Sequence, residues 1–430
     1  MFSRFLKQFP LLFICFFFFF FFFDFSFPIV FSYYFFLDKF RFYLIYLRFL
    51  VFCFVIIIIS KNYILITTIT LLFIFIISRF LVKDLIFFYI FFELSLLPLL
   101  LIIITYGFQP ERLEAAVYFL LYALVGSFPL LRKIIYYQIL LGKAKLFFYF
   151  FRNYFVDYYL NPNKIMGFFW MFPFLIKLPI YGFHLWLPKA HVESPVIGSM
   201  ILASVMLKLG AYGLFRFSQF NFLNSFELTV CWVLVTSFWV RLIAYRNVDI
   251  KALIAYSSIS HMSFLIIIIF YLNCVTSLSL LMILVGHGFV RRRMFFIFNS
   301  LYNKSLSRSI ILKKALRLKS KLFFFFFFFV LIFNSSFPLN LTFFSEVILR
   351  LVLICFYNFF LIFFILSLFF VGLYKIILFL ITRHGYQKTG LHSNHNVLII
   401  TNKDASLSFF HLIFKIFTLF FFFLWFFFWF

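Results

Sequence analysis

The chain has 430 residues, of which 66% are hydrophobic and 12% are charged. A soluble domain is about 45–50% apolar and about 25% charged, so this composition excludes a water-soluble globular fold and makes lipid the solvent. The 38 Lys and Arg residues against 12 Asp and Glu residues give a formal net charge of +26. Because the basic residues lie mostly between apolar runs, where they orient helices and meet lipid headgroups, nucleic-acid binding is not expected.

The sequence offers no motif for binding an electron carrier or a nucleotide. Its five Cys residues lie in apolar segments without a C-x-x-C, and neither a P-loop nor a G-x-G-x-x-G occurs. We therefore expect this chain to bind no cofactor and no metal. The 85 Phe residues include uninterrupted runs at 16–23 and 323–329, which are typical of lipid-facing surfaces and of a T-rich organelle genome.

Apolar segments long enough to span a bilayer recur along the whole sequence. We expect an all-α, polytopic transmembrane bundle of about 12–14 helices by this length criterion. The predicted spans are near 9–31, 42–59, 63–82, 85–105, 114–140, 165–183, 196–218, 226–243, 251–272, 274–298, 322–349, 351–380 and 406–430. The expected organisation is a single domain, 1–430, with divergent N-terminal helices (1–84), a motif-bearing core (85–309) and C-terminal helices (310–430).

Basic loops give an incomplete answer on orientation. Loops 241–251, 299–321 and 381–405 share one side by helix parity, which the positive-inside rule assigns to the matrix or cytoplasm. The basic loop 142–164 falls on the opposite side and leaves the orientation open.

A few ionisable residues lie inside predicted spans, far from any loop: Glu93, Lys177, Lys208, His261, His287 and Glu346. A charge at the bilayer centre is costly, and it persists where it faces a bundle interior, finds a partner or serves a function. Burial brings the pKa of a Lys and that of a Glu toward neutral pH, where His titrates already. The pattern predicts proton transfer; static ion pairs or snorkelling side chains are the structural alternative.

Prolines accompany two of these charges. Pro173 and Pro179 flank Lys177, and Pro338 precedes Glu346 by about two turns. Proline interrupts the hydrogen-bond ladder of a helix, and broken helices are a common device of ion pathways. The loop residues His184, His191 and Glu193 lack a metal-site spacing and are expected to pack the loop or line a pathway entry.

Four blocks carry a family resemblance. The most specific is KLPIYGFHLWLPKAHVESPVIGSMILASVMLKLGAYGLFRF at 177–217, and the others lie at 88–131, 246–262 and 286–309. In order and spacing they resemble the subunit 4 family of mitochondrial NADH dehydrogenase (NADH:ubiquinone oxidoreductase, respiratory complex I). The wider family comprises antiporter-like subunits, including those of multisubunit sodium/proton antiporters.

The resemblance implies roles for the buried charges within an antiporter-like fold of two inverted repeats with broken helices. It pairs Glu93 with Lys177 near the proton entry and makes Lys208 the central relay. His261 and His287 extend the hydrophilic axis, and Glu346 leads protons toward the outer side. The stretch FPLNLTFFSE around Glu346 departs from the family's motif at Leu339, Thr342 and Ser345.

The resemblance also implies partners and a location. The chain would move protons across the mitochondrial inner membrane as a multi-pass subunit, driven by quinone reduction elsewhere in the complex. FMN, iron–sulfur clusters and ubiquinone would be held by other subunits. The expected partners are the other membrane-arm and accessory subunits and inner-membrane lipids such as cardiolipin.

The Arg cluster Arg291, Arg292 and Arg293 departs from the family, which has small or apolar residues there. Three adjacent side chains point in different directions around a helix, so at least one is expected to face lipid. Otherwise the helix ends early, lipid headgroups or accessory subunits cover the cluster, or the codons for these residues are misread. This cluster motivates one alternative, a structural membrane-arm subunit that no longer pumps. The other alternative is a cation/proton antiporter subunit outside respiration.

Overall fold

The structure is a computed structural model of the full chain. It describes residues 29–30, 36–37, 39–59, 62–82, 84–107, 109–141, 164–218, 227–271, 273–305, 307–310, 321–335, 340–356 and 361–384. The predicted span 406–430 and nearly all of the span 9–31 lie outside these residues. So do most residues of the basic loops 142–164 and 381–405, and the orientation across the membrane therefore stays a prediction.

The described chain is helical apart from two short strands, β1 (Ile29–Val30) and β2 (Phe36–Leu37), which pair antiparallel. Among the described residues, seven helical segments are long and apolar enough to cross a membrane. They are Tyr63–Leu81, Leu85–Tyr106, Arg112–Tyr136, Val196–Ser218, Thr229–Arg246, Ile250–Phe270 and Leu361–Arg383. The prediction of an all-α, polytopic membrane bundle is confirmed.

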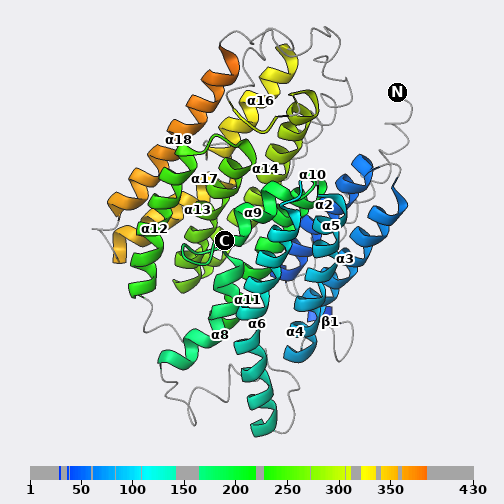
Figure 1. The fold of residues 1–430 in the computed structure, drawn as a ribbon. Helices are drawn as coiled ribbons and strands as arrows, with labels where there is room; N and C mark the ends of the chain where they lie inside the picture. The colour runs from blue at the N-terminus through cyan, green and yellow to red at the C-terminus, as the bar shows by residue number, and fades with distance from the viewer. Residues whose placement is uncertain are drawn as a thin grey trace. The chain divides into compact units, whose positions relative to one another are not determined.

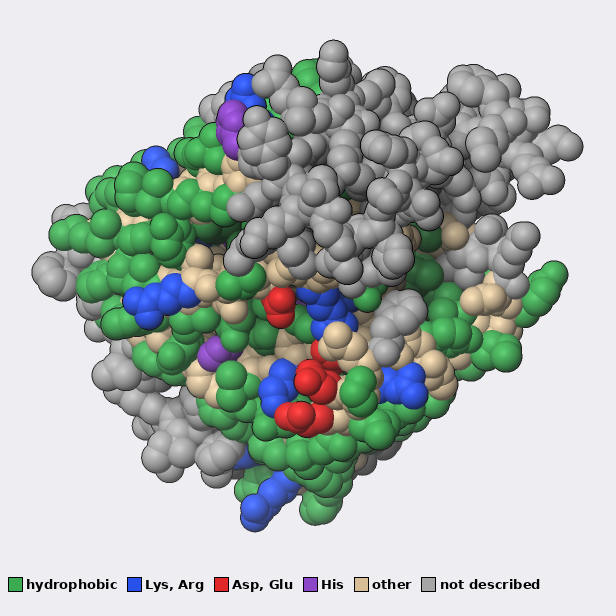
Figure 2. All heavy atoms as spheres, turned by 45° about the horizontal axis from the view of Figure 1, so that its top comes forward, with side chains coloured by type: hydrophobic (Ala, Val, Ile, Leu, Met, Phe, Trp, Pro, Cys, Tyr) green, Lys and Arg blue, Asp and Glu red, His purple; other side chains and the backbone are tan. Residues whose placement is uncertain are grey.

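The surface agrees with a lipid environment. Large apolar side chains such as Ile139, Phe128 and Ile74 are more than half exposed. In the space-filling view, hydrophobic side chains cover much of the visible described surface, the Asp and Glu side chains lie near one another, and Lys and Arg side chains also appear at several separate places (Figure 2). An exposed apolar surface of this extent is stable only where lipid or another protein covers it in place of water.

The chain folds as two compact units. The first, the N-terminal unit, comprises Met1–Lys177 and Glu193–Asn224. Its helices, labelled in Figure 1, are α2 (Lys39–Ile59), α3 (Tyr63–Leu81), α4 (Leu85–Leu94), α5 (Leu96–Tyr106), α6 (Arg112–Leu141), α8 (Lys164–Lys177), α10 (Val196–Ile201) and α11 (Leu207–Ser218), with the π-helical segment η1 (Leu202–Met206) between α10 and α11.

Helix α8 lies between α6 and α11 within this unit, and α3 packs against α2, α4 and α5. The approach of α11 to α8 depends on Gly213, because a Cβ there would overlap the ring of Phe174. The broad apolar composition of these helices, rather than a narrow hydrophobic stripe, suits elements that face protein on one side and lipid on the other.

The second, the C-terminal unit, comprises Leu178–Val192 and Ser225–Phe430. Its helices are α9 (Trp186–Glu193, whose last residue belongs to the other unit), α12 (Glu227–Arg246), α13 (Ile250–Phe270), α14 (Cys274–Ser305), α16 (Lys321–Asn334), α17 (Leu341–Phe356) and α18 (Leu361–Arg383). Helix α13 packs against α12, α14 and α17, and 19 of its 21 residues are buried. A Cβ on Gly286 would lie 2.9 Å from Cγ2 of Thr342, so this glycine permits the close approach of α14 and α17.

The prediction that one residue of the Arg cluster faces lipid is wrong. Arg291, Arg292 and Arg293 are all buried, with at most 2% of each side chain exposed. The reason is that α14 packs against α13, α16 and α17, and His191 of α9 stacks on Phe295 as well. A helix surrounded in this way has no lipid-facing direction at that height.

Three predicted helix boundaries also need correction. The span 165–183 ends as a helix at Lys177, and the span 322–349 is two helices, since α16 ends at Asn334 and α17 begins at Leu341. Helix α17 continues to Phe356, past the start of the predicted span 351–380. The length of the apolar runs did not locate these breaks, although Pro179 follows Lys177 and the polar stretch at 334–340 contains Pro338. The division at 84 and 309 stays a prediction.

Candidate functional site

Lys177 ends α8 inside the N-terminal unit, and its ammonium group is buried. Nζ lies 2.7 Å from the centroid of the Phe92 ring and has no hydrogen-bond partner among the described residues. The charges of Glu93 and Arg79 both act on it, one attractive and one repulsive. A cation on an aromatic face is held by electrostatics without a directional bond, so its proton remains available for exchange.

Glu93 lies at the end of α4, next to the break between α4 and α5 at Ser95. Its Oε1 is buried, and no described residue bonds to it. The charge of Glu93 acts on Lys177, whose ammonium rests on the neighbouring ring of Phe92, and the pairing of the two residues stays a prediction.

Two buried arginines accompany this pair and were missed from the sequence. The Arg79 guanidinium lies over the rings of Phe88 and Phe92 at 4.4 and 4.0 Å, and its Nη2 donates to the Leu209 carbonyl at 3.4 Å. Arg48 lies 3.6 Å above Phe80, and none of its guanidinium nitrogens finds a hydrogen-bond acceptor in the described part of the chain. Arg79 stands near the end of its apolar segment, where a basic residue is ordinarily interfacial.

Lys208 is fully buried in α11, directly after the π-helical segment η1. Its Nζ donates to the carbonyl of Ala203, five residues earlier and inside η1. A π-helical turn widens the helix and releases carbonyls from the i→i+4 ladder, and such segments are frequent at functional sites. The sequence carries no clear signal for this π-turn.

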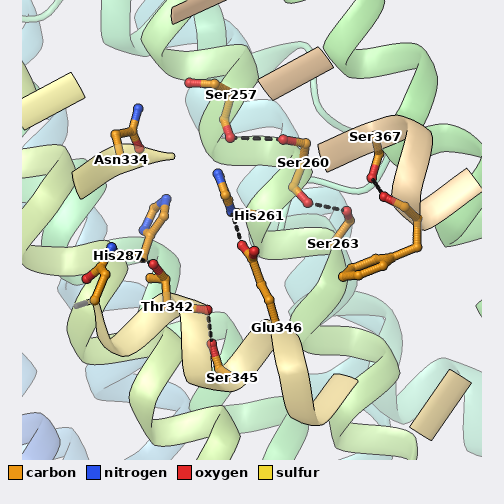
Figure 3. A network of polar contacts seen from close by, with 12 residues as sticks. Ser257, Ser260, His261, Ser263, His287, Asn334, Thr342, Ser345, Glu346 and Ser367 are labelled. Atoms are coloured by element: carbon orange, nitrogen blue, oxygen red, sulfur yellow. Dashed lines mark hydrogen bonds and ion pairs between the residues drawn. The ribbon is translucent and has the colours of Figure 1, made fainter. Parts of the chain in front are cut away.

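The C-terminal unit brings three predicted residues together around α13 (Figure 3). Nδ1 of His261 lies 3.5 Å from Oε1 of Glu346 on α17, and both side chains are buried. The ring centroids of His261 and His287 are 6.3 Å apart. Nε2 of His261 is buried and has no hydrogen-bond partner among the described residues. Nδ1 of His261 therefore lies beside a carboxylate, whereas no described residue is hydrogen-bonded to Nε2.

His287 has a different environment, although it lies close by on α14. Nε of Arg291 donates to its Nε2 at 3.2 Å. The same guanidinium donates through Nη1 to the Ile254 carbonyl and the Ser257 hydroxyl, and through Nη2 to the Ser257 carbonyl. Arg291 is thus anchored to α13 while it bonds the imidazole one turn away on its own helix.

Two further cations face Glu346 and were not singled out from the sequence. Lys375 of α18 is buried and donates to the carbonyl of Asn334, the last residue of α16. Arg241 was assigned to the basic loop 241–251, but α12 continues to Arg246 and buries it fully. The charge of Glu346 acts on both. Both residues lie inside predicted spans, 226–243 and 351–380, but close to the C-terminal end of each, where a basic side chain is ordinarily interfacial.

The segment between α8 and α9 holds His184 and a turn at Gly182, where φ is +99°. The backbone N–H of Gly182 donates to Nδ1 of His184 at 3.3 Å, and the imidazole stacks on Tyr181. Burial lowers the pKa of His184. In the described part of the chain, no three His, Cys, Asp or Glu side chains are grouped as metal ligands.

These helices and their buried charges define a polytopic membrane protein with acid–base groups inside its bundle. The family model for the NADH:quinone oxidoreductase/Mrp antiporter transmembrane region matches residues 82–373. The chain is 37% identical over 281 residues to NADH-ubiquinone oxidoreductase chain 4 of Artemia franciscana, covering 65% of this chain and 70% of that one. The chain therefore belongs to the NADH:quinone oxidoreductase/Mrp antiporter family.

Solved structures share the fold. A chain of respiratory complex I from Thermus thermophilus with bound NADH aligns with a TM-score of 0.76 at 21% identity, over 90% of this chain and 82% of that one. A chain of the Mrp complex from Dietzia sp. DQ12-45-1b aligns with a TM-score of 0.73 at 15% identity, over 82% and 68%. The predicted antiporter-like fold is confirmed. The relatives support the predicted multi-pass location in the mitochondrial inner membrane.

Proposed function

We propose that the chain is a proton-translocating subunit in the membrane arm of NADH:ubiquinone oxidoreductase. Family membership and the similarity to chain 4 proteins support this assembly. One observation carries the proposal: three of the predicted relay residues each have a buried polar atom to which no described residue is hydrogen-bonded. Nζ of Lys177, Oε1 of Glu93 and Nε2 of His261 have no hydrogen-bond partner among the described residues.

A buried polar atom without a protein partner is costly unless water or a moving group satisfies it. A structural ion pair would satisfy these atoms with direct bonds. A proton carrier instead needs an atom that can accept and release a proton through water or a moving neighbour. The arrangement therefore favours transfer over a static role.

In the N-terminal unit, Glu93 and Lys177 act as a switch, because the carboxylate stabilises the ammonium and its withdrawal favours proton release. Lys208 carries the next step, held at the π-helical segment. In the C-terminal unit, His261 accepts a proton at Nε2 and gives up the one at Nδ1 to Glu346, which then releases it on the outer side.

The chain contributes proton chemistry and no redox site, and the energy comes from quinone reduction in neighbouring subunits. Moving one proton against 100 mV costs about 2.3 kcal/mol. FMN, iron–sulfur clusters and ubiquinone are bound elsewhere in the complex, and accessory subunits and inner-membrane lipids contact this chain. A cation/proton antiporter outside respiration is the competing function.

The test is the number of protons pumped per electron by the complete complex in proteoliposomes. Lys177→Met should lower this ratio while the complex still assembles, and Lys133→Met, on a half-buried residue of α6, should leave it unchanged. An unchanged ratio in Lys177→Met would remove Lys177 from the relay. Cation exchange by the chain without any quinone reductase partner would instead support the competing antiporter.

A further inference from the structure

His261 and His287 lie side by side, yet their ring nitrogens are in different states. A histidine passes a proton along when one nitrogen receives it and the other releases it. His261 meets this requirement, with Nε2 open and Nδ1 beside Glu346. His287 does not, because an N–H of Arg291 points at its Nε2.

The hydrogen bond defines the tautomer of His287. A guanidinium is a donor only, so Nε2 of the imidazole must present its lone pair to Nε–H of Arg291. In that state Nε2 carries no hydrogen. The ring can take up a proton there only after the guanidinium withdraws from it.

Withdrawal is opposed by the other bonds of the guanidinium. Arg291 is fully buried, and its two terminal nitrogens bond the Ile254 carbonyl, the Ser257 hydroxyl and the Ser257 carbonyl on α13. The Ser257 hydroxyl also donates to the Ile254 carbonyl at 2.8 Å, so these acceptors form one connected set. Moving the guanidinium would leave several buried donors and acceptors unpaired at once.

We propose that Arg291 is a positioning residue that holds His287 as a fixed hydrogen-bond acceptor, so that protons in the C-terminal unit pass through His261 and Glu346 and not through His287. This inference deepens the proposed function and rests on it. It gives the buried arginine a role, because its hydrogen bond removes a competing imidazole from the proton route.

The experiment compares proton pumping by the complete complex carrying His287→Gln or His261→Gln. A glutamine carbonyl at position 287 can accept the Arg291 N–H in place of Nε2. We expect His287→Gln to keep the wild-type proton-to-electron ratio and His261→Gln to lower it at least tenfold. His287→Asn, whose shorter amide does not reach the place of Nε2, should reduce the amount of assembled complex.

The outcomes separate this inference from the proposed function. An assembled His287→Gln complex that loses pumping as fully as His261→Gln overturns the inference and leaves the proposed function intact. Full pumping by His261→Gln and by Lys208→Met overturns the proposed function, and the inference with it.

If His287→Gln does not assemble, Arg291→Met decides the matter. The charged and titratable groups of this cluster are His261, Glu346, Tyr374, Lys375, Arg241 and the three arginines of α14. Removing the guanidinium frees Nε2 of His287, so the pH profile of pumping should shift, and Arg291→Met combined with His287→Gln should restore the wild-type profile. An unchanged profile in the assembled single variant overturns the inference.

Discussion

Nδ1 of His261 lies 3.5 Å from Oε1 of Glu346, between helices whose residue numbers are far apart. The imidazole comes from α13, which is buried along nearly its whole length, and the carboxylate comes from α17, five residues after its first residue. Lys375 and Arg241 face the same carboxylate from α18 and α12. The Glu346 carboxylate is therefore a counter-charge for several cations, and these interactions connect α17 with α12, α13 and α18.

Glu346→Gln should abolish most of the pumping. Removing the carboxylate takes away the acceptor beside His261 and leaves buried cations without their counter-charge, a change that costs about 3–5 kcal/mol when one partner of a buried pair is lost. We expect the proton-to-electron ratio to fall at least tenfold and the assembled complex to unfold at a lower temperature. Glu111→Gln, on an exposed residue, is the matched control. Equal pumping in both variants would contradict the role of Glu346.

Phe92→Leu should weaken the switch without touching a charge. The Lys177 ammonium lies on the Phe92 ring, and a cation–π interaction away from water contributes up to about 2 kcal/mol. Losing the ring destabilises the charged form of Lys177, so pumping should slow while the quinone reductase activity persists. Phe87→Leu changes an exposed ring of the same helix and should have no effect. A wild-type pumping rate in Phe92→Leu would mean that the ring is only packing.

The sequence predicted the helical architecture and the principal charges because both follow from the cost of polar groups in lipid. Glu93, Lys177 and Lys208 share one unit, and His261, His287 and Glu346 share the other. Arg241 and Lys375 were missed because they stand near the ends of apolar runs, where a basic residue ordinarily reaches the interface. These side chains are buried by neighbouring helices that are distant in sequence, so the local residue pattern does not predict their burial.

The burial of all three arginines of α14 shows the same limit. Residue spacing around a helix gives the directions of side chains but not what lies in each direction. The role of the Arg291 hydrogen bonds could not be inferred either, since its acceptors belong to α13 and are more than 30 residues away in sequence.

Gly213→Ala should destabilise the N-terminal unit. The added Cβ would overlap the ring of Phe174, and overpacking of this kind costs about 1–3 kcal/mol. Gly372→Ala is the control, because a Cβ there meets nothing within 4 Å and Ala favours a helix interior over Gly by about 1 kcal/mol. The thermal unfolding midpoint of the assembled subunit should fall in the first variant and hold or rise in the second. If the unfolding midpoint fell in both variants, the effect would come from replacing any helical glycine of this subunit and not from the contact with Phe174.

His184→Asn should make the unfolding midpoint depend less on pH below about pH 6.5. Burial lowers the pKa of His184, so the unfolded chain binds a proton more tightly than the folded one. Stability is therefore fully present above the unfolded pKa of about 6.5 and is lost as the pH falls through the folded pKa. The Asn carbonyl can still accept the Gly182 N–H but does not titrate. Unfolding midpoints measured on both sides of about pH 6.5 should converge in the variant. His384→Asn, on an exposed residue, should keep the wild-type slope.

Lys375→Met tests whether the cation of α18 is structural or belongs to the Glu346 cluster. Its ammonium bonds the Asn334 carbonyl at the end of α16, and a buried carbonyl left unpaired costs about 1–3 kcal/mol. Loss of a structural bond alone lowers the unfolding midpoint and leaves the proton-to-electron ratio unchanged. Because Glu346 also acts on Lys375, we expect both to fall in Lys375→Met. Lys375→Arg keeps a donor and a charge, so it should recover the midpoint. If pumping recovers with it, the charge at this position matters for Glu346; if pumping stays low, the smaller, mobile ammonium is itself required.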